Sequence, residues 1–286
     1  MPTSAEELVE LLDLETIDAN LFRGQQPDTT LQRVFGGQVA GQALVAAART
    51  VSAELAAHSL HSYFLRPGDT TVPIVYDVDP VRDGKSFSTR RVLARQHGKP
   101  IYAMTASFQV LEEGFEHQDS MPEVPAPEDS LNIGEMYRSP DSPRAEEWSR
   151  DWAALELLHA GDSKHGLPDT DKHPARARYW VRSAGKLPDD PLIHQAVLTY
   201  LSDLTLIRTS LIPHEASIDK GVQAASLDHT VWFHRPFRAD EWLLYAQRSP
   251  SASGARGLIL GQLFSRDGVL VASVAQEGLI RPRPEA

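Results

Sequence analysis

One series of motifs occurs twice in the chain, and this repetition constrains the fold more than any other feature. The motif Phe-x-Arg-Pro is found at 64–67 and again at 233–236. In both halves an Arg-bearing segment follows, and then a Gly turn leads into an Ala-rich apolar segment. A repeat this long corresponds to a domain-sized unit rather than to a short solenoid repeat. The sequence therefore predicts one structural unit built twice, with a site at the joint that can take different residues from each copy.

The expected secondary structure has the same order in both halves: a short strand, a long helix and then an antiparallel meander. In the first half the strand spans 21–24, the helix 34–50 and the later strands 60–65, 72–80, 86–96 and 100–110. In the second half the strand spans 177–183, the helix 192–211 and the later strands 225–233, 242–249, 255–264 and 269–279. The second helix is apolar on nearly all sides, which indicates burial. This order predicts an α+β fold in which each sheet wraps one long helix.

Proline and charged residues are concentrated between the two halves. We therefore divide the chain into a first unit, 1–117, a connecting segment, 118–174, and a second unit, 175–286. Proline removes the N–H group that a strand ladder needs, so no continuous strand is expected in the connecting segment. A short helix is expected at 145–159, where tryptophan and leucine recur at helical spacing.

Composition excludes several classes of protein. The chain of 286 residues contains no cysteine, which excludes disulfides and thiolate chemistry. Its net charge of -11 argues against nucleic acid as a partner, and means that local basic residues must hold any phosphate-bearing ligand. No apolar run approaches the roughly 20 residues that span a bilayer, and the N-terminus lacks the pattern of a signal peptide. We therefore expect a cytoplasmic protein without a membrane partner.

Four ungapped motifs are long enough to point to a known family. They are Leu-Phe-Arg-Gly-Gln at 21–25, Val-Phe-Gly-Gly-Gln-Val at 34–39, His-Ser-Tyr-Phe-Leu-Arg-Pro-Gly at 61–68 and Trp-Phe-His-Arg-Pro-Phe at 232–237. With them the chain resembles the acyl-CoA thioesterase II family over nearly its whole length, most weakly in the connecting segment. The resemblance implies a double hot-dog fold and hydrolysis of acyl-CoA to free fatty acid and CoA, without a metal or cofactor.

The same resemblance implies a catalytic set in the second unit. The family places a water-activating Asp, Thr and Gln there, and the matching positions are Asp203, Ser226 and Gln276. Serine in place of threonine keeps the hydroxyl and loses a methyl group. The implied mechanism is direct attack by the activated water, without a covalent intermediate.

The first unit is expected to lack this catalytic set. Its matching positions are predicted near Gln42, His58 and Ser107, none of which supplies a carboxylate. One competent site per chain is therefore expected.

Considered without the resemblance, these residues leave alternatives open. Asp203 is a carboxylate in a helix expected to be buried, so it must be paired, hydrogen-bonded or functional. Gln276 is either a polar residue of an edge strand or an amide that orients water. Ser226 alone is an ordinary residue at the end of a strand. His229 is interpreted as a core histidine, and it cannot pair with Asp228 because adjacent strand residues point to opposite faces.

Basic residues of the strands are the candidates for binding substrate. His58 is one candidate, and Arg90, Arg91 and Arg256 are candidates for the CoA phosphates. The alternatives are a histidine packed against a helix and ordinary exposed strand arginines.

Two rival functions and one assembly state complete the expectations. A (3R)-enoyl-CoA hydratase would resemble an Asp and a His five or six residues apart, but His194 precedes Asp203 at a longer spacing. A non-enzymatic acyl-CoA sensor would leave the cost of burying Asp203 unexplained. The outer sheet edges favour pairing with a second chain, so a homodimer or homotetramer is expected.

Overall fold

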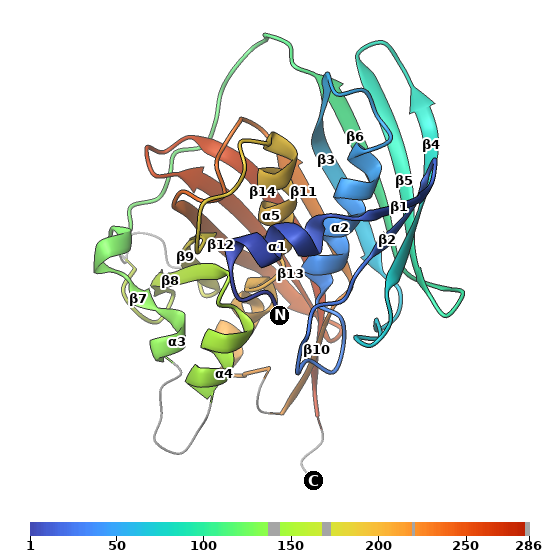
Figure 1. Ribbon diagram of the computed structural model, residues 1–286. Helices are drawn as coiled ribbons and strands as arrows, with labels where there is room; N and C mark the ends of the chain where they lie inside the picture. Colours follow the sequence, from blue (N-terminus) through green and yellow to red (C-terminus); the bar gives the residue numbers. More distant parts are fainter. Residues whose placement is uncertain (137–143, 168–172, 219–220, 284–286) are drawn as a thin grey trace.

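The computed structural model describes residues 1–136, 144–167, 173–218 and 221–283 (Figure 1). A 14-stranded antiparallel sheet runs through these residues and curves around two central helices, α2 (Gly36–Ala48) and α5 (Pro191–Ser202). The sheet order is β1-β2-β4-β5-β6-β3-β11-β14-β13-β12-β9-β8-β7, and β10 also pairs with β14. The expected α+β double hot-dog fold is confirmed.

The N-terminal unit comprises α2 and the strands β1 to β6. Helix α1 (Ala5–Leu12) precedes it and packs against α2 and α5. Its strands are β1 (Glu15–Asp18), β2 (Leu21–Gly24), β3 (Leu55–Phe64), β4 (Ile74–Asp83), β5 (Phe87–Gln96) and β6 (Lys99–Val110).

The C-terminal unit comprises α5, α6 (Leu206–Leu211) and the strands β9 to β14. The strands that follow α6 are β10 (Val222–Ser226), β11 (Asp228–Phe233), β12 (Leu243–Ser253), β13 (Arg256–Ser265) and β14 (Leu270–Pro282). Strand β9 (Arg176–Ser183) precedes α5. The expected helix 192–211 is thus interrupted after Ser202, and the expected strand 225–233 is split at Leu227.

The connecting segment contributes more regular structure than the sequence predicts. It holds β7 (Leu131–Asn132), α3 (Ile133–Met136), α4 (Arg144–Asp151) and β8 (Leu155–Asp162). The expected helix 145–159 is correct only as far as Asp151. Leucines 155 and 157 face inward with the two-residue period of a strand, and β8 pairs with β9. No proline occurs between 144 and 167, so nothing blocks the ladder. The division at 117/118 and 174/175 remains a prediction.

The first part of the connecting segment crosses the outer face of the C-terminal unit. Gln118 donates from its amide to the carbonyl of Gly268 and accepts from the N–H of Leu270. Further along, Met121 and Val124 pack on an apolar cluster that includes Trp180 and Phe264. This segment therefore covers apolar surface that the C-terminal sheet would otherwise expose.

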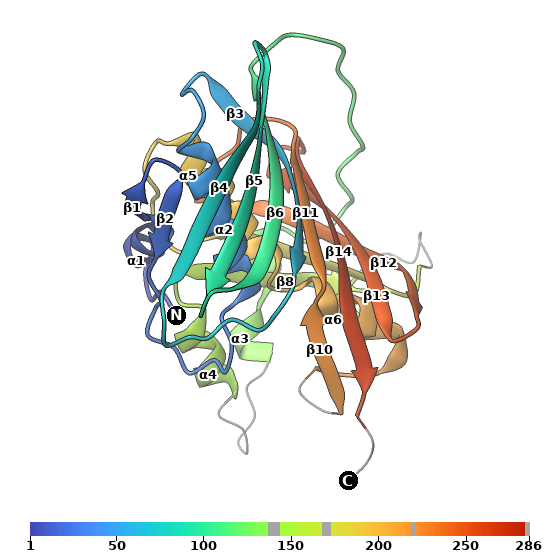
Figure 2. The ribbon, with the colours of Figure 1, turned by 90° about the vertical axis from the view of Figure 1, so that its right-hand side faces the viewer.

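The two units are joined by strands and by helices. Strands β3 and β11 lie side by side (Figure 2), with Thr230 opposite His61, and make the sheet continuous. Helices α2 and α5 pack against each other in opposite directions. A Cβ atom on Gly37 would lie 2.1 Å from the carbonyl oxygen of Tyr200, and one on Gly41 would lie 3.1 Å from that of Ala196. The two helix backbones can approach this closely only because glycine has no side chain.

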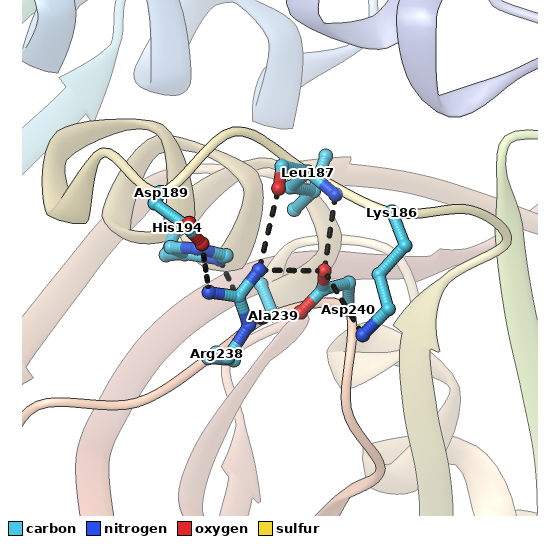
Figure 3. Close-up of polar contacts among 7 residues, drawn as sticks. All are labelled: Lys186, Leu187, Asp189, His194, Arg238, Ala239 and Asp240. Atoms are coloured by element: carbon cyan, nitrogen blue, oxygen red, sulfur yellow. Dashed lines mark hydrogen bonds and ion pairs between the residues drawn. The ribbon is translucent and has the colours of Figure 1, made fainter.

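A polar cluster fixes the start of α5 (Figure 3). Asp190 caps the helix by accepting from the N–H of Leu192. Arg238 pairs with Asp240, whose carboxylate also accepts from the N–H of Leu187. Arg238 also pairs with Asp189, and the N–H of Ala239 donates to Nδ1 of His194 in α5, so the loop before β12 is held against the start of this helix. None of the helices in the described ranges is long and apolar enough to cross a membrane.

We predict that Gly37→Ala destabilises the protein because its methyl group would force α2 and α5 apart. The expected loss in the free energy of unfolding is about 1–3 kcal/mol, the usual cost of overpacking a tight contact. Gly114→Ala is the matched control, since nothing lies within 4 Å of an added Cβ there. Urea unfolding of both variants checks the prediction, and equal midpoints would contradict it.

Candidate active site

Asp203 lies where the C-terminal end of α5 meets the N-terminal end of α2, so each unit contributes one helix end. It is the C-cap residue of α5, and its side chain is largely buried. It faces the start of α2, where a Cβ on Gly36 would lie 2.6 Å from Asp203 Oδ2. The N-cap of α2 is Phe35, which makes no side-chain cap hydrogen bond. The positive dipole end of α2 therefore faces the Asp203 carboxylate and opposes the effect of the negative dipole end of α5, where Asp203 itself lies.

Ser226 and Gln276 complete the predicted set. The hydroxyl of Ser226 donates to Asp203 Oδ1 at 2.9 Å, and Nε2 of Gln276 donates to Ser226 Oγ at 2.9 Å. Gln276 is fully buried on β14, whereas Ser226 ends β10 and is partly open. The three residues implied by the family resemblance thus form one hydrogen-bonded group.

A β-bulge turns Ser226 toward the inside. Ser226 is opposite Gly278 and Thr230 is opposite Ala275, so β10–β11 has one residue more than β14 between these pairs. The extra residue at Leu227 reverses the alternation of side chains. Ser226 and His229 therefore share the inner face. Without the bulge, simple alternation would place Ser226 on the same face as Asp228. Asp228 Oδ1 instead accepts from the backbone N–H of Glu277.

His229 belongs to the same group, which the sequence did not reveal. Its Nδ1 lies 2.6 Å from Gln276 Oε1, and its Nε2 lies 2.8 Å from Ser202 Oγ. The ring is fully buried. Burial lowers the pKa of His229, and the negative charge of Asp203 partly offsets this effect. The burial of His229 agrees with its interpretation as a core histidine. Its contact with Gln276 was not predicted, because the bulge that brings Ser226 to the same face cannot be read from alternation.

The N-terminal unit lacks the equivalent group. It has the same bulge in β3, between Ala57 and Ser59. The matching register gives Ala57, Leu60 and Ala106 as the counterparts of Ser226, His229 and Gln276.

The expected positions near Gln42, His58 and Ser107 are therefore corrected. His58 and Ser107 are each one residue away from a counterpart, and their side chains bond to each other at 2.8 Å. Gln42 lies inside α2, whose C-cap is Arg49, and it bonds to Tyr76.

A cavity of about 490 Å³ opens onto Asp203 and Ser226. Phe35 and Gly36 at the start of α2 form one wall, and Trp148 of α4 and Trp152, which follows that helix, form another. Leu204, Ile207, Arg208 and Arg33 also line it. The cavity therefore lies at the joint of the two units and combines apolar walls with one buried carboxylate. Within the described ranges, no group of three or more His, Asp or Glu side chains is placed to hold a metal ion.

The four predicted substrate-binding residues do not line this cavity. Arg90 is buried and bonds to Thr50 and Asp83 inside the N-terminal unit. Arg91 pairs with Asp79 on the surface, and Arg256 pairs with Glu277. His58 is occupied by Ser107. Their proposed contact with substrate remains an untested prediction, whereas Arg33 and Arg208 do line the cavity.

Comparison with known proteins identifies the class. The sequence profile of the acyl-CoA thioesterase family matches residues 169–279, and that of the acyl-CoA thioesterase N-terminal domain matches 25–109. The chain is 44% identical to acyl-CoA thioesterase 2 of Haemophilus influenzae, covering 96% of each. The crystal structure of an acyl-CoA thioesterase II from Mycobacterium marinum superposes with a TM-score of 0.85 at 44% identity, covering 97% of this chain and 99% of that one.

A more distant structure supports the fold alone. It is a hot-dog protein from Alicyclobacillus acidocaldarius, 22% identical, with a TM-score of 0.76 and coverage of 96% and 97%. The fold, the site and these similarities define a tandem hot-dog thioester hydrolase. The chain belongs to the acyl-CoA thioesterase II family, and the predicted family and enzyme class are confirmed.

We predict that His229 makes the stability of the protein depend on pH. Since burial lowers its pKa in the folded state, the unfolded chain binds the proton more readily. Stability is therefore full above about pH 6.5, the unfolded value, and falls as the pH drops below it, by up to about 1.4 kcal/mol per pH unit. His229→Asn lacks this proton, so its curve of unfolding free energy between pH 7.5 and 5 should be flatter. Parallel curves for wild type and variant would refute the prediction.

Proposed function

We propose that the cavity hydrolyses acyl-CoA with a water activated by Asp203, without a covalent acyl-enzyme. The observation that carries the proposal is a buried carboxylate that lines the cavity, with Ser226 on one oxygen and the start of α2 near the other. Asp203 and Ser226 line the cavity, whereas Gln276 is buried behind Ser226. We therefore assign the water to Asp203 and Ser226, and we assign Gln276 to orienting the Ser226 hydroxyl.

The reaction then proceeds in two steps. The water oxygen attacks the thioester carbonyl while its proton passes to Asp203, and the carbonyl oxygen becomes an oxyanion. We assign stabilisation of that oxyanion to backbone N–H groups at the start of α2, where the N-cap residue Phe35 makes no side-chain cap hydrogen bond. The carbon–sulfur bond then breaks, and the CoA thiolate leaves and takes up the proton held by Asp203, which returns to its ionised form. Since a thiolate is a good leaving group, no strong general acid is needed.

The position of Arg33 indicates which end of acyl-CoA lies nearest to the second hollow beside the cavity. A second hollow of about 480 Å³ shares Leu31, Arg33 and Ala224 with the active-site cavity and is also lined by Arg283. Both arginines are exposed. In a chain with net charge -11, they provide local positive charge next to the site. We propose that the phosphates of CoA lie along this second hollow and that the thioester reaches Asp203.

Replacing the carboxylate tests the proposed mechanism. Asp203→Asn should lower kcat by about 10²–10⁴, the usual contribution of a positioned general base. Thiol release from short- to long-chain acyl-CoAs measures the effect and gives the chain-length preference. Asp228→Asn is the matched control, because this nearby carboxylate bonds to the Glu277 backbone outside the site. Activity of Asp203→Asn within about threefold of wild type would rule out Asp203 as the base.

A separate prediction concerns the CoA phosphates. Arg33→Ala should raise KM for an acyl-CoA about tenfold with little change in kcat, because one charge-assisted hydrogen bond is lost. The matched substrate is the corresponding N-acetylcysteamine thioester, which carries no phosphate and should show no difference between wild type and variant. An equal effect on both substrates would contradict the assignment.

The rival function and the assembly state call for separate measurements. In the hydratase alternative a His would act beside Asp203, but His229 contacts Gln276 and Ser202 instead. Product analysis with crotonyl-CoA distinguishes hydration from hydrolysis. Strands β1 and β7 are the two edges of the sheet, where a second chain could pair. The homodimer or homotetramer remains a prediction. The cytoplasmic location also remains a prediction.

A further inference from the structure

The hydrogen bonds around His229 form a chain of side-chain contacts that begins at Ser202 and ends at Asp203, the next residue in the sequence. Ser202 contacts His229, His229 contacts Gln276, Gln276 contacts Ser226, and Ser226 contacts Asp203, all at 2.6 to 2.9 Å. Ser202 and Asp203 are adjacent at the end of α5. The imidazole of His229 is therefore linked to the Asp203 carboxylate in two ways. One runs through the side chains of Gln276 and Ser226, and the other runs through Ser202 and the peptide bond to Asp203.

The chemistry of the donors fixes the direction of this chain of contacts. An ionised Asp203 only accepts, so Ser226 must donate to it and then accepts from the Gln276 N–H. The amide oxygen of Gln276 then faces His229, so Nδ1 must carry a hydrogen. In the neutral ring Nε2 carries no hydrogen and can accept from the Ser202 hydroxyl, whose single hydrogen is shared between Nε2 at 2.8 Å and the carbonyl of Thr199 at 3.0 Å. A change of tautomer at His229 would place an acceptor opposite the amide oxygen and favour turning the amide around.

We propose that His229 is a positioning residue for hydrolysis: its Nδ1–H holds the Gln276 amide in the orientation that donates to Ser226. The inference rests on the proposed function of Asp203 and Ser226. His229 does not contact the water or the substrate. It acts through Gln276, and the donor order from Asp203 through Ser226 to Gln276 requires the hydrogen on Nδ1.

The N-terminal unit supports this assignment. On an equally bulged strand pair, that unit has Leu60 as the counterpart of His229, and Ala57 and Ala106 as the counterparts of Ser226 and Gln276. Leu60 is also fully buried, so the fold accepts an apolar side chain at this position. The buried imidazole is present in the unit that carries the carboxylate and absent from the one that does not. Filling space in the fold is therefore no sufficient reason for a histidine at 229.

A double-mutant cycle with Gln276 tests the inference. His229→Leu should lower kcat about 10- to 100-fold and change KM less than about twofold, because a positioning group acts on the reacting state. In a Gln276→Ala background the same change should have no further effect on kcat, since its only route of action is already gone. His229→Asn keeps an N–H near the position of Nδ1 and should retain at least about a third of wild-type kcat.

A second cycle covers the case in which His229→Leu does not fold. Ser202→Ala is a smaller change beside the same ring, and it should lower kcat about threefold to tenfold only when Gln276 is present. Losses that multiply in both cycles would overturn the inference and leave His229 a packing residue. Asp203→Asn is measured in the same assay. Its retained activity would refute the proposed function, whereas its loss of activity with multiplying cycles would refute the inference alone.

Discussion

The close packing of α2 on α5 is the contact on which the active site depends. Glycines at 37 and 41 let the two helix backbones touch, and this places the start of α2 beside the end of α5. The carboxylate of Asp203 therefore lies at the positive end of a helix from the other unit. Neither unit alone offers both a carboxylate and a helix start in this position. The site is a property of the joint between them.

Two local irregularities turn this joint into a site. The helix stops at Ser202, so Asp203 sits at a helix end rather than inside a turn. The bulge at Leu227 then turns Ser226 toward that carboxylate and sets His229 on the same face. A regular helix and a regular strand would bury the same residues without bringing them together. The interruptions of secondary structure are thus where the proposed catalytic residues meet.

The sequence predicts the architecture well because its repeated motifs and periodicity describe regular elements. The order of strands and helices follows from periodicity, and the family follows from four ungapped motifs. The three proposed catalytic residues are implied by that resemblance and not by the residues alone. It predicts irregular features poorly. The bulge at Leu227, the break after Ser202 and strand β8 depend on tertiary pairing, which no local pattern records. The basic residues chosen for CoA show the same limit, since Arg90 looks like a ligand-binding residue and is instead bonded inside its own unit.

The apolar counterparts in the N-terminal unit set different rules for sequence change in the two halves. Ala57, Leu60 and Ala106 are buried and contribute only volume, so substitutions there are restricted by size. Ser226 and Gln276 must also satisfy hydrogen-bonding groups, so only side chains with the right donors and acceptors can replace them. Two halves with one fold therefore tolerate mutation unequally. In a set of aligned relatives, we expect variation to follow this division at structurally matched positions.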